Sequence, residues 1–327
     1  MKLIAPFPYF GGKKTIAHRV WGVLGDVPNY VEPFAGSLAV LLQRPHTPKI
    51  ETVNDKDGFI SNFWRALKWD ADGVSDYANW PVNENDLHAR HYWLMQQKEN
   101  LQAKLEGDPD WYDVKIAGWW VWGMACWIGG GFCSGDGPWN VVDGKMVKSA
   151  NNGNGIARRL PHLGNAGRGI NRRCSDIHGY LSQLGERLQR VRVCCGDWSR
   201  VCGSGVTCHN GTTGVFLDPP YSEEAGRAEV YTCEDLSVAH EVREWAIDAG
   251  KHPKMRVVLC GYEGEHAMPE DWHVIEWKAQ GGMAHLGYGR GKENRHRERL
   301  WYSPHCLEPN DMPLFRGASS RPQEGEE

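Results

Sequence analysis

The chain has 327 residues, of which 41% are hydrophobic and 24% are charged, and its formal net charge is −4. These proportions are ordinary for a globular protein and exclude a wholly disordered or fibrous chain. No uncharged apolar run approaches the roughly 18 residues of a membrane span, and the N-terminus lacks a secretory signal pattern, so we expect a cytoplasmic protein without a membrane partner.

Seven β-rich segments follow one another along the chain, at residues 30–34, 49–53, 191–195, 215–218, 256–260, 273–277 and 299–302. Two amphipathic stripes lie between them: Ile177, Leu181, Leu184 and Leu188 form the first, and Val238, Val242, Trp245 and Ala249 form the second. This spacing is typical of helices with one buried face. The alternation predicts a doubly wound, mostly parallel, seven-stranded Rossmann-like α/β sheet.

The middle of the chain has a different pattern. Leu87, Leu94, Leu101 and Leu105 predict one long helix, and residues 115–127 predict another. Beyond residue 128 the periodicity fails, although Asp143-Gly144 between short apolar pairs is typical of a hairpin. We therefore predict a helical and loop-rich subdomain at 57–176, inserted into an α/β domain formed by 1–56 and 177–309. Residues 310–327 are rich in Pro, Gly and Glu and predict a flexible tail.

The first strand ends in a turn of small residues, Ala35-Gly36-Ser37, and an apolar pattern that begins at Leu38 predicts a helix after it. Such a turn lets a ligand approach backbone N–H groups. Asp55 directly follows the second strand, where an acidic side chain of a doubly wound fold can accept hydrogen bonds from a ribose. The two features together favour a nucleoside cofactor, although a plain tight turn remains an alternative because the full glycine-rich spacing is missing.

A stronger signal is Asp218-Pro219-Pro220-Tyr221, at the carboxyl end of the strand that contains residues 215–217. Ligands of open α/β sheets bind at this edge. The two prolines restrict the backbone and remove two donors, which leaves the Asp218 carboxylate and a proline carbonyl as acceptors beside an aromatic ring. This combination can bind an amino group while the ring stacks on the attached heterocycle. The structural alternative is a Pro-Pro turn with Tyr221 in the core.

Five segments in a fixed order resemble a known family. They are Tyr9-Phe10-Gly11-Gly12-Lys13, Glu32-Pro33-Phe34-Ala35-Gly36-Ser37, Asn54-Asp55, Gly196-Asp197-Trp198 and Asp218-Pro219-Pro220-Tyr221. Their order, with a long insert before the last segment, is similar to that of the Dam-type, α-group DNA adenine-N6 methyltransferases. The resemblance covers both α/β ends of the chain and leaves the insert unmatched.

The resemblance implies a cofactor, S-adenosyl-L-methionine, and a methyltransferase sheet that binds it. Tyr9 and Lys13 would contact the cofactor, Asp55 its ribose and Asp197 its adenine, and Asp218 would serve both the cofactor and the target base. The implied cofactor-binding set is Tyr9, Gly12, Lys13, Glu32, Pro33, Phe34, Gly36, Ser37, Asp55, Asp197, Trp198 and Asp218. The family often has Trp at the position of Tyr9 and a second Gly at the position of Leu38.

The implied reaction is direct transfer of the methyl group to the exocyclic N6 of adenine. The lone pair of this nitrogen is delocalised into the ring, so acceptors on its hydrogens are needed, and Asp218 and Pro219 fit that task. The implied catalytic residues are Asp218, Pro219, Pro220 and Tyr221. We expect no metal and no Cys nucleophile. A base inside a duplex has to be flipped out to reach such a pocket, where Tyr221 would replace part of its stacking.

The insert contains a basic stretch that favours double-stranded DNA as the partner. Between Gly144 and Ser175 there is no Asp or Glu, and the cationic residues are Lys145, Lys148, Arg158, Arg159, Arg168, Arg172 and Arg173. Arg and Lys suit phosphates and guanine edges. A solvated loop is the alternative. A second basic stretch, from Arg290 to Arg299, contains two glutamates and fits a surface connection equally well.

Two other clusters favour structural interpretations. Cys194, Cys195, Cys202, Cys208 and His209 are close in sequence, but their spacing is not the paired pattern of a zinc site, and incidental thiols are the better interpretation. Four tryptophans near residues 119–127 fit the core of the insert better than a stacking wedge.

Three functions remain open from the sequence: methylation of adenine N6 in DNA, methylation of RNA or another base amino group by the same pocket, and DNA binding without catalysis. Intact Lys13, Asp55, Asp218 and Tyr221 disfavour the last of these. Nothing in the sequence specifies the recognised DNA sequence, a partner nuclease or an oligomeric state.

Overall fold

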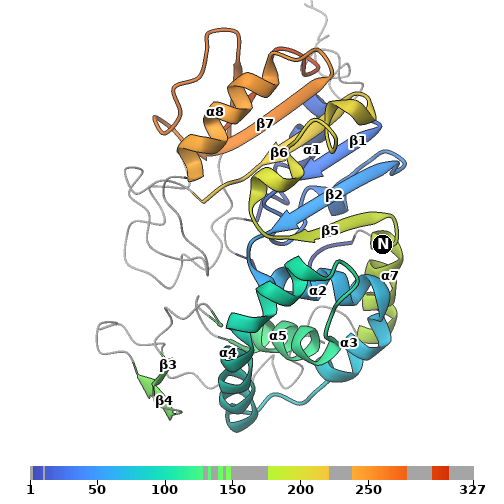
Figure 1. Ribbon diagram of the computed structural model, residues 1–327, viewed down its shortest axis with the longest axis vertical. Coiled ribbons are helices and arrows are strands. Elements are labelled where there is room, and N and C mark those ends of the chain that lie inside the picture. The colour runs from blue at the N-terminus through green and yellow to red at the C-terminus, as the bar shows by residue number, and fades with distance from the viewer. Residues whose placement is uncertain are drawn as a thin grey trace, which may run out of the picture.

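The computed structural model describes residues 3–9, 12–127, 132–133, 139–142, 145–148, 176–220, 238–277 and 297–308. Seven of the described strands form one sheet (Figure 1). They are β1 (Asn29–Glu32), β2 (Ile50–Asp55), β5 (Val191–Cys195), β6 (Thr213–Leu217), β7 (Met255–Tyr262), β8 (His273–Glu276) and β9 (Glu298–Tyr302). The order across the sheet is β5-β2-β1-β6-β7-β9-β8.

Strands β5, β2, β1, β6 and β7 run parallel to one another, and β9 is antiparallel to both β7 and β8. Every residue of β1 and β6 is buried, as expected for central strands of a sheet that is covered on both faces. The prediction of a mostly parallel, seven-stranded Rossmann-like sheet is confirmed, and each predicted strand overlaps an observed one.

The described α-helices are α1 (Ala17–Leu24), α2 (Gly58–Trp69), α3 (Ala71–Ala78), α4 (Glu84–Gly107), α5 (Val114–Cys126), α7 (Ile177–Leu188) and α8 (Val238–Gly250). Three short 3-10 segments are η1 (Leu41–Gln43), η3 (Trp198–Val201) and η4 (Cys208–Asn210). A separate hairpin pairs β3 (Trp139–Val142) with β4 (Lys145–Lys148). The predicted helices at 177–188 and 238–249, the long leucine-striped helix and the hairpin are therefore confirmed.

Two hydrophobic clusters cover the two faces of the sheet. Side chains alternate across a strand, so neighbouring residues of β1 belong to different clusters. Tyr30 belongs to the first cluster and Val31 to the second. The first cluster contains apolar residues of α1, α2, α5 and α7, and the second contains residues of α8 and η3. Figure 1 shows α8 beside β7 and α2 next to β5.

The predicted helix after the turn at Gly36 is wrong. Only the three residues of η1 adopt helical geometry, and Leu38 has a φ of 52°, in the left-handed region that interrupts a right-handed helix. Arg44 is extended, with a ψ of 121°, as expected for a residue that precedes a proline. The apolar pattern that suggested a helix reflects burial instead, since Leu38, Val40, Leu41 and Leu42 are all in the core.

Helix α2 begins at the predicted start of the insert and packs against β2, β5 and α7. Asp57 caps it by accepting a hydrogen bond from the Phe59 N–H. The domain limits at 56/57 and 176/177 stay predictions, and the predicted tail lies outside the described residues. Trp120, Trp122 and Trp127 are buried, which confirms their assignment to the core. Within the described ranges, no helix combines the length and apolar character that crossing a membrane requires.

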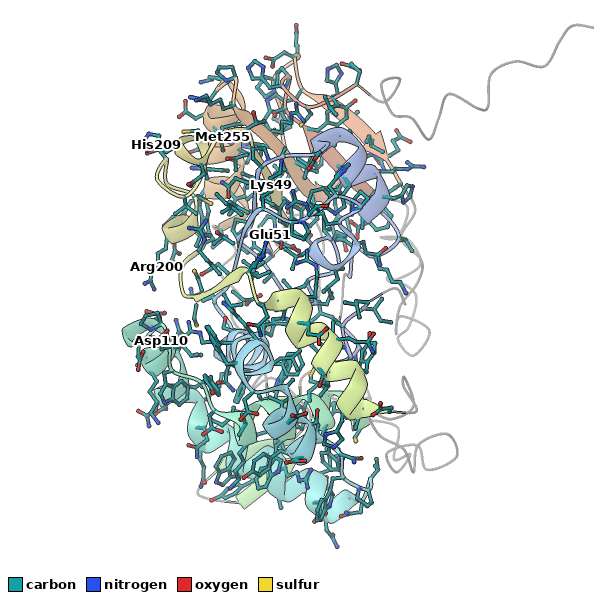
Figure 2. The ribbon with its side chains drawn as sticks, turned by 90° about the vertical axis from the view of Figure 1, so that its right-hand side faces the viewer. Lys49, Glu51, Asp110, Arg200, His209 and Met255 are labelled. Atoms are coloured by element: carbon teal, nitrogen blue, oxygen red, sulfur yellow. The ribbon has the colours of Figure 1, made fainter. Side chains whose placement is uncertain are left out.

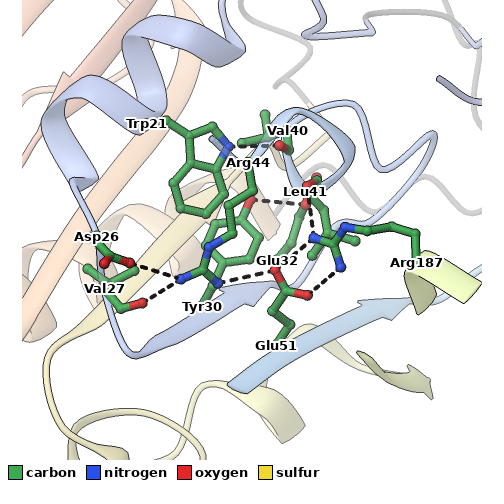
Figure 3. Close-up of polar contacts among 10 residues, drawn as sticks. All are labelled: Trp21, Asp26, Val27, Tyr30, Glu32, Val40, Leu41, Arg44, Glu51 and Arg187. Atoms are coloured by element: carbon green, nitrogen blue, oxygen red, sulfur yellow. Dashed lines mark hydrogen bonds and ion pairs between the residues drawn. The ribbon is translucent and has the colours of Figure 1, made fainter. Parts of the chain in front are cut away.

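A buried ion cluster lies at the amino end of β2. The Glu51 carboxylate accepts hydrogen bonds from Arg44 at 3.1 Å and from both terminal nitrogens of Arg187 at 2.7 and 2.9 Å (Figure 3). The side chains of Glu51 and Arg44 are 1% and 0% exposed. Figure 2 labels Lys49 and Glu51 at the start of β2 and Met255 at the start of β7, on the amino-terminal edge of the sheet. The cluster thus joins β2, α7 and the segment after η1.

Replacing Glu51 is expected to be strongly destabilising. Glu51→Ala removes the anion that both guanidinium groups share and leaves Arg44 only the longer contact with the half-exposed Asp26 at 3.8 Å, which costs about 3–5 kcal/mol of unfolding free energy. Urea unfolding at pH 7 measures this loss. The control is Asp248→Ala, which breaks the exposed pair of Asp248 with Lys251 and is expected to change the free energy by less than about 1 kcal/mol. Equal stabilities of the two variants would contradict the importance of the cluster.

Candidate active site

The side chain of Asn54 connects the loops that follow three parallel strands. Asn54 is 1% exposed, and its amide nitrogen donates to the Pro33 carbonyl at 3.1 Å and to the Gly196 carbonyl at 3.0 Å. Its backbone carbonyl accepts a hydrogen bond from the Ala35 N–H at 2.8 Å. The carboxyl ends of β1, β2 and β5 are therefore fixed relative to one another.

The turn after β1 is closed by contacts that only glycine permits. Gly36 has a φ of +45°, and a Cβ at this position would lie 2.6 Å from a ring carbon of Tyr9. Its N–H donates to a carboxylate oxygen of Asp55 at 2.8 Å, and its carbonyl accepts from the Trp64 indole at 2.8 Å. The structure thus brings together Tyr9, Gly36 and Asp55, three residues that the sequence analysis selected.

The backbone of Leu38 explains why a glycine suits this position. A left-handed conformation costs a non-glycine residue roughly 1–2 kcal/mol, and Leu38 adopts it with a φ of 52°. The side chain is fully buried, and burying a leucine contributes about 1.5–3 kcal/mol, which offsets the strain. The turn therefore keeps its geometry although it lacks a second glycine.

Two acidic groups at this edge have raised pKa values. The Asp55 carboxylate accepts hydrogen bonds from the N–H groups of Gly36 and Asp57. Its removal from water nevertheless raises its pKa to about 7, and the charge of Asp57 adds to the shift. Burial also raises the pKa of Glu32 to about 8. The hydroxyl group of Tyr30 donates to Glu32 at 3.0 Å and opposes that shift. Strongly perturbed carboxyl groups are typical of functional sites.

An ion pair joins the N-terminal segment to the end of β6. The Lys13 ammonium lies 2.9 Å from an oxygen of Asp218, and the two side chains are 4% and 20% exposed. Pro219, which follows Asp218, is buried. The two segments that the resemblance combines, one with Lys13 and one with Asp218 and Pro219, are therefore in direct contact. Tyr221 lies outside the described residues.

The remaining candidates around the site are held by local contacts. Asp197 is exposed, and its carboxylate accepts hydrogen bonds from the N–H and hydroxyl groups of Ser199. The rings of Phe34 and Trp198 stack with centroids 6.3 Å apart. A Cβ on Gly12 would lie 3.8 Å from the hydroxyl oxygen of Ser37, so these two positions are adjacent. The functional roles of all these residues stay predictions.

The basic stretch of the insert is described only in part. Lys145 and Lys148 are the first and last residues of β4. The other five members, Arg158, Arg159, Arg168, Arg172 and Arg173, lie outside the described residues, as does most of the second basic stretch.

The cysteine cluster consists of thiols in the described structure. Cys195 and Cys202 are buried, and burial raises the pKa of each to about 12. Cys194 and Cys208 are half-buried. In the part of the chain that the structure describes, no three His, Cys, Asp or Glu side chains form a group that could hold a metal ion.

The sequence analysis did not select Tyr30 and Asn54 as individual site residues. Tyr30 precedes Glu32 by two positions in a predicted strand, and this spacing alone places both on one face of the sheet. Asn54 was named within a motif, but its contacts with Pro33 and Gly196 depend on the pairing of β2 with β1 and β5. The alternation of side chains along the first strand would have identified Tyr30 as a residue on the same face as Glu32.

Comparison with known families identifies the enzyme class. Residues 9–109 match the family model described as D12 class N6 adenine-specific DNA methyltransferase. Together with the Rossmann-like sheet, this match indicates that the chain is an adenine-specific DNA methyltransferase. A comparison with curated proteins found no match to the chain.

A substitution at Gly36 is expected to disrupt the turn. Gly36→Ala forces a side chain into the Tyr9 ring and a left-handed backbone on alanine, and it should cost about 1–3 kcal/mol of unfolding free energy. Gly12→Ala is the control, because its Cβ would lie 3.5 Å from the nearest atom, which is ordinary van der Waals contact. Thermal and urea unfolding of both variants test the difference. A Gly36→Ala protein as stable as Gly12→Ala would argue against a constrained turn.

Proposed function

We propose that this chain transfers a methyl group from S-adenosyl-L-methionine to the exocyclic N6 of adenine in double-stranded DNA, and that it is of the Dam type (α-group). The observation that carries the proposal is the 2.9 Å contact between Lys13 and Asp218. It connects the segment that precedes the Gly36 turn with the acceptor cluster Asp218-Pro219, so that one edge of the sheet offers both a cofactor site and a base site.

The described residues fit such a cofactor in two respects. The backbone of the Gly36 turn lies directly against the ring of Tyr9, because a Cβ there would be 2.6 Å from a ring carbon, so backbone groups and an aromatic ring are side by side. The side-chain oxygen of Asn54 is buried between the loops after β1 and β5 and has no hydrogen-bond partner among the described residues. When bound, the cofactor supplies a methyl group on a positively charged sulfur.

The residues that would hold the cofactor come from five segments. Asp55, at the end of β2, would accept hydrogen bonds from the ribose hydroxyl groups, as acidic residues at this position do in doubly wound folds. The others are Tyr9, Gly12 and Lys13 before α1, Glu32, Pro33, Phe34, Gly36 and Ser37 at the first turn, Asp197 and Trp198 after β5, and Asp218 after β6.

Asp218 and Pro219 would act on the target base. The Asp218 carboxylate and the Pro219 carbonyl accept the two hydrogens of the adenine amino group, which localises the nitrogen lone pair. The nitrogen would then be placed to take the methyl group that the cofactor would supply from its sulfur, and it would lose one amino proton to solvent. Lys13 keeps the Asp218 carboxylate in place beside the cofactor site.

Access to the base requires that it leave the duplex. An amino group inside the double helix cannot reach acceptors at the edge of a sheet, so the adenine is flipped into the pocket. Tyr221, directly after Pro220 in the chain, would stack on the flipped base, which contributes roughly 1–3 kcal/mol. The basic stretch of the insert would bind the phosphates of the surrounding duplex.

The proposal is tested by methyl transfer from labelled cofactor to duplex DNA. Asp218→Ala removes an acceptor of the amino hydrogens and is expected to lower the rate at least about 100-fold. The control is Asp271→Ala, an exposed residue away from the site, which should retain the wild-type rate. RNA and free nucleosides serve as alternative substrates. Transfer to these and not to DNA, or a normal rate for Asp218→Ala, would refute the proposal.

DNA binding by the insert is tested by salt dependence. If Arg172 and Arg173 each neutralise a phosphate, replacing both with Ala should flatten the slope of log affinity against log salt by up to about two units. If they read guanine edges instead, the loss should fall on the preferred site, at roughly 1–3 kcal/mol per contact.

The control for this titration is the double variant Arg190→Ala/Arg192→Ala. Both arginines are exposed at the amino end of β5, at the opposite edge of the sheet from the site. Binding is measured for preferred and scrambled duplexes. Equal slopes and affinities for the wild type and the Arg172/Arg173 variant would remove both residues from the DNA interface.

A further inference from the structure

The side chain of Tyr30 lies in the core, on the same strand as Glu32 and two residues before it. Tyr30 is fully buried, its ring packs on Trp21 with centroids 4.7 Å apart, and its hydroxyl group donates to Glu32 at 3.0 Å (Figure 3). Glu32 is the last residue of β1 and is 2% exposed. The Tyr30 hydroxyl is thus a fixed donor to an acid at the edge of the site.

The charges around Glu32 differ from those around Glu51, although both acids are buried. Glu51, which pairs with Tyr30 in the sheet register, has two arginines. Glu32 has no cation within ion-pair distance among the described residues, and its hydrogen-bond donors are the Tyr30 hydroxyl and the backbone of Leu41. Lys13, the nearby cation of the site, is paired with Asp218.

The other titratable groups that act on this region include two cations, Arg44 beside Tyr30 and Lys13 near Cys260, and several acids. Asp218 at the end of β6 and Glu51 on β2 both disfavour the ionised form of Glu32. Cys260 on β7 and Glu298 on β9 belong to the same electrostatic environment. Among the described residues the buried Glu32 carboxyl has no cation within ion-pair distance, and S-adenosyl-L-methionine carries positive charge on its sulfur and its amino group.

We infer that Tyr30 is a positioning residue of the cofactor site: its hydroxyl group holds the Glu32 carboxyl so that the cofactor's positive charge displaces a proton from it. This inference rests on the proposed function. In the free protein burial favours the neutral carboxyl, and Tyr30 donates to one of its oxygens. When the cation binds, the carboxyl proton passes to solvent, the carboxylate pairs with the cation, and Tyr30 keeps its own proton and continues to donate.

Two properties of the free protein support this order of events. Burial raises the pKa of Glu32 to about 8, so the protonated form is favoured at pH 7. Burial and the neighbouring Glu32 raise the pKa of Tyr30 well above 10, so Tyr30 remains a donor throughout. Because binding requires the ionised carboxylate, affinity rises with pH up to about pH 8, where the free carboxyl ionises unaided.

Calorimetry of cofactor binding in two buffers of different ionisation enthalpy measures the released proton. At pH 7 the wild type should release close to one proton, and Glu32→Gln should release none and bind more weakly. Asp55 also has a raised pKa and is the alternative source of a released proton, so Asp55→Asn is measured alongside. Proton release that persists in Glu32→Gln and disappears in Asp55→Asn would overturn the inference. A wild type that does not bind the cofactor at all would instead refute the proposed function.

Tyr30→Phe tests the positioning role and retains the ring that packs on Trp21. Losing a hydrogen bond to a charged group should weaken cofactor binding about tenfold or more at pH 7. The carboxylate also becomes harder to form, so the deficit should shrink to a few-fold at pH 8.5. The ratio of variant to wild-type affinity cancels any titration of the cofactor itself.

The matched control is Tyr180→Phe, which removes another buried tyrosine hydroxyl that exchanges hydrogen bonds with the backbone of Ile4. It should leave both the affinity and its pH dependence unchanged. Circular dichroism and thermal unfolding confirm that each variant is folded. A Tyr30→Phe affinity equal to wild type, or a deficit that is constant from pH 7 to 8.5, would overturn the positioning role.

Discussion

The parallel pairing of β1 with β2 on one side and β6 on the other is the constraint on which the site depends. Residues Asn29–Glu32 of β1 pair with Ile50–Val53 of β2, and Asn29–Val31 pair with Thr213–Val215 of β6. The segments after these strands therefore emerge at one edge, although more than 150 residues separate β2 from β6 in the chain. The Gly36 turn, Asp55 and Asp218 meet there because parallel strands all end on the same side of a sheet.

The distribution of buried charge distinguishes the two ends of these strands. At the amino end, Glu51 has two arginine partners, and the arrangement is consistent with a structural role. At the carboxyl end, Glu32 and Asp55 accept hydrogen bonds but form no ion pair with any described residue, and their pKa values are raised. Burying such groups costs folding free energy, so their position agrees with a site whose missing positive charge is brought by a ligand.

The turn after β1 shows how local and tertiary preferences compete. Its apolar residues predicted a helix because their spacing fits one face of a helix, but the chain forms only η1. The left-handed Leu38 and the prolines that follow Arg44 prevent a longer helix, and the leucines are buried without it. The N–H group of Gly36 in this turn therefore donates to the Asp55 carboxylate and does not lie at the start of a helix.

The sequence by itself determined the strands, the main helices and the segments that meet at the site, since period-two and helical patterns and the motifs around Gly36 and Asp218 are local properties. It could not show that Lys13 pairs with Asp218, that Asn54 connects Pro33 with Gly196, or that Tyr30 donates to Glu32 rather than only filling the core. These contacts, and the difference in charge between Glu32 and Glu51, were decided by tertiary structure. The order of the strands brings the distant partners of Lys13 and Asn54 within hydrogen-bond distance, and the packing of the core against β1 removes Tyr30 and Glu32 from water.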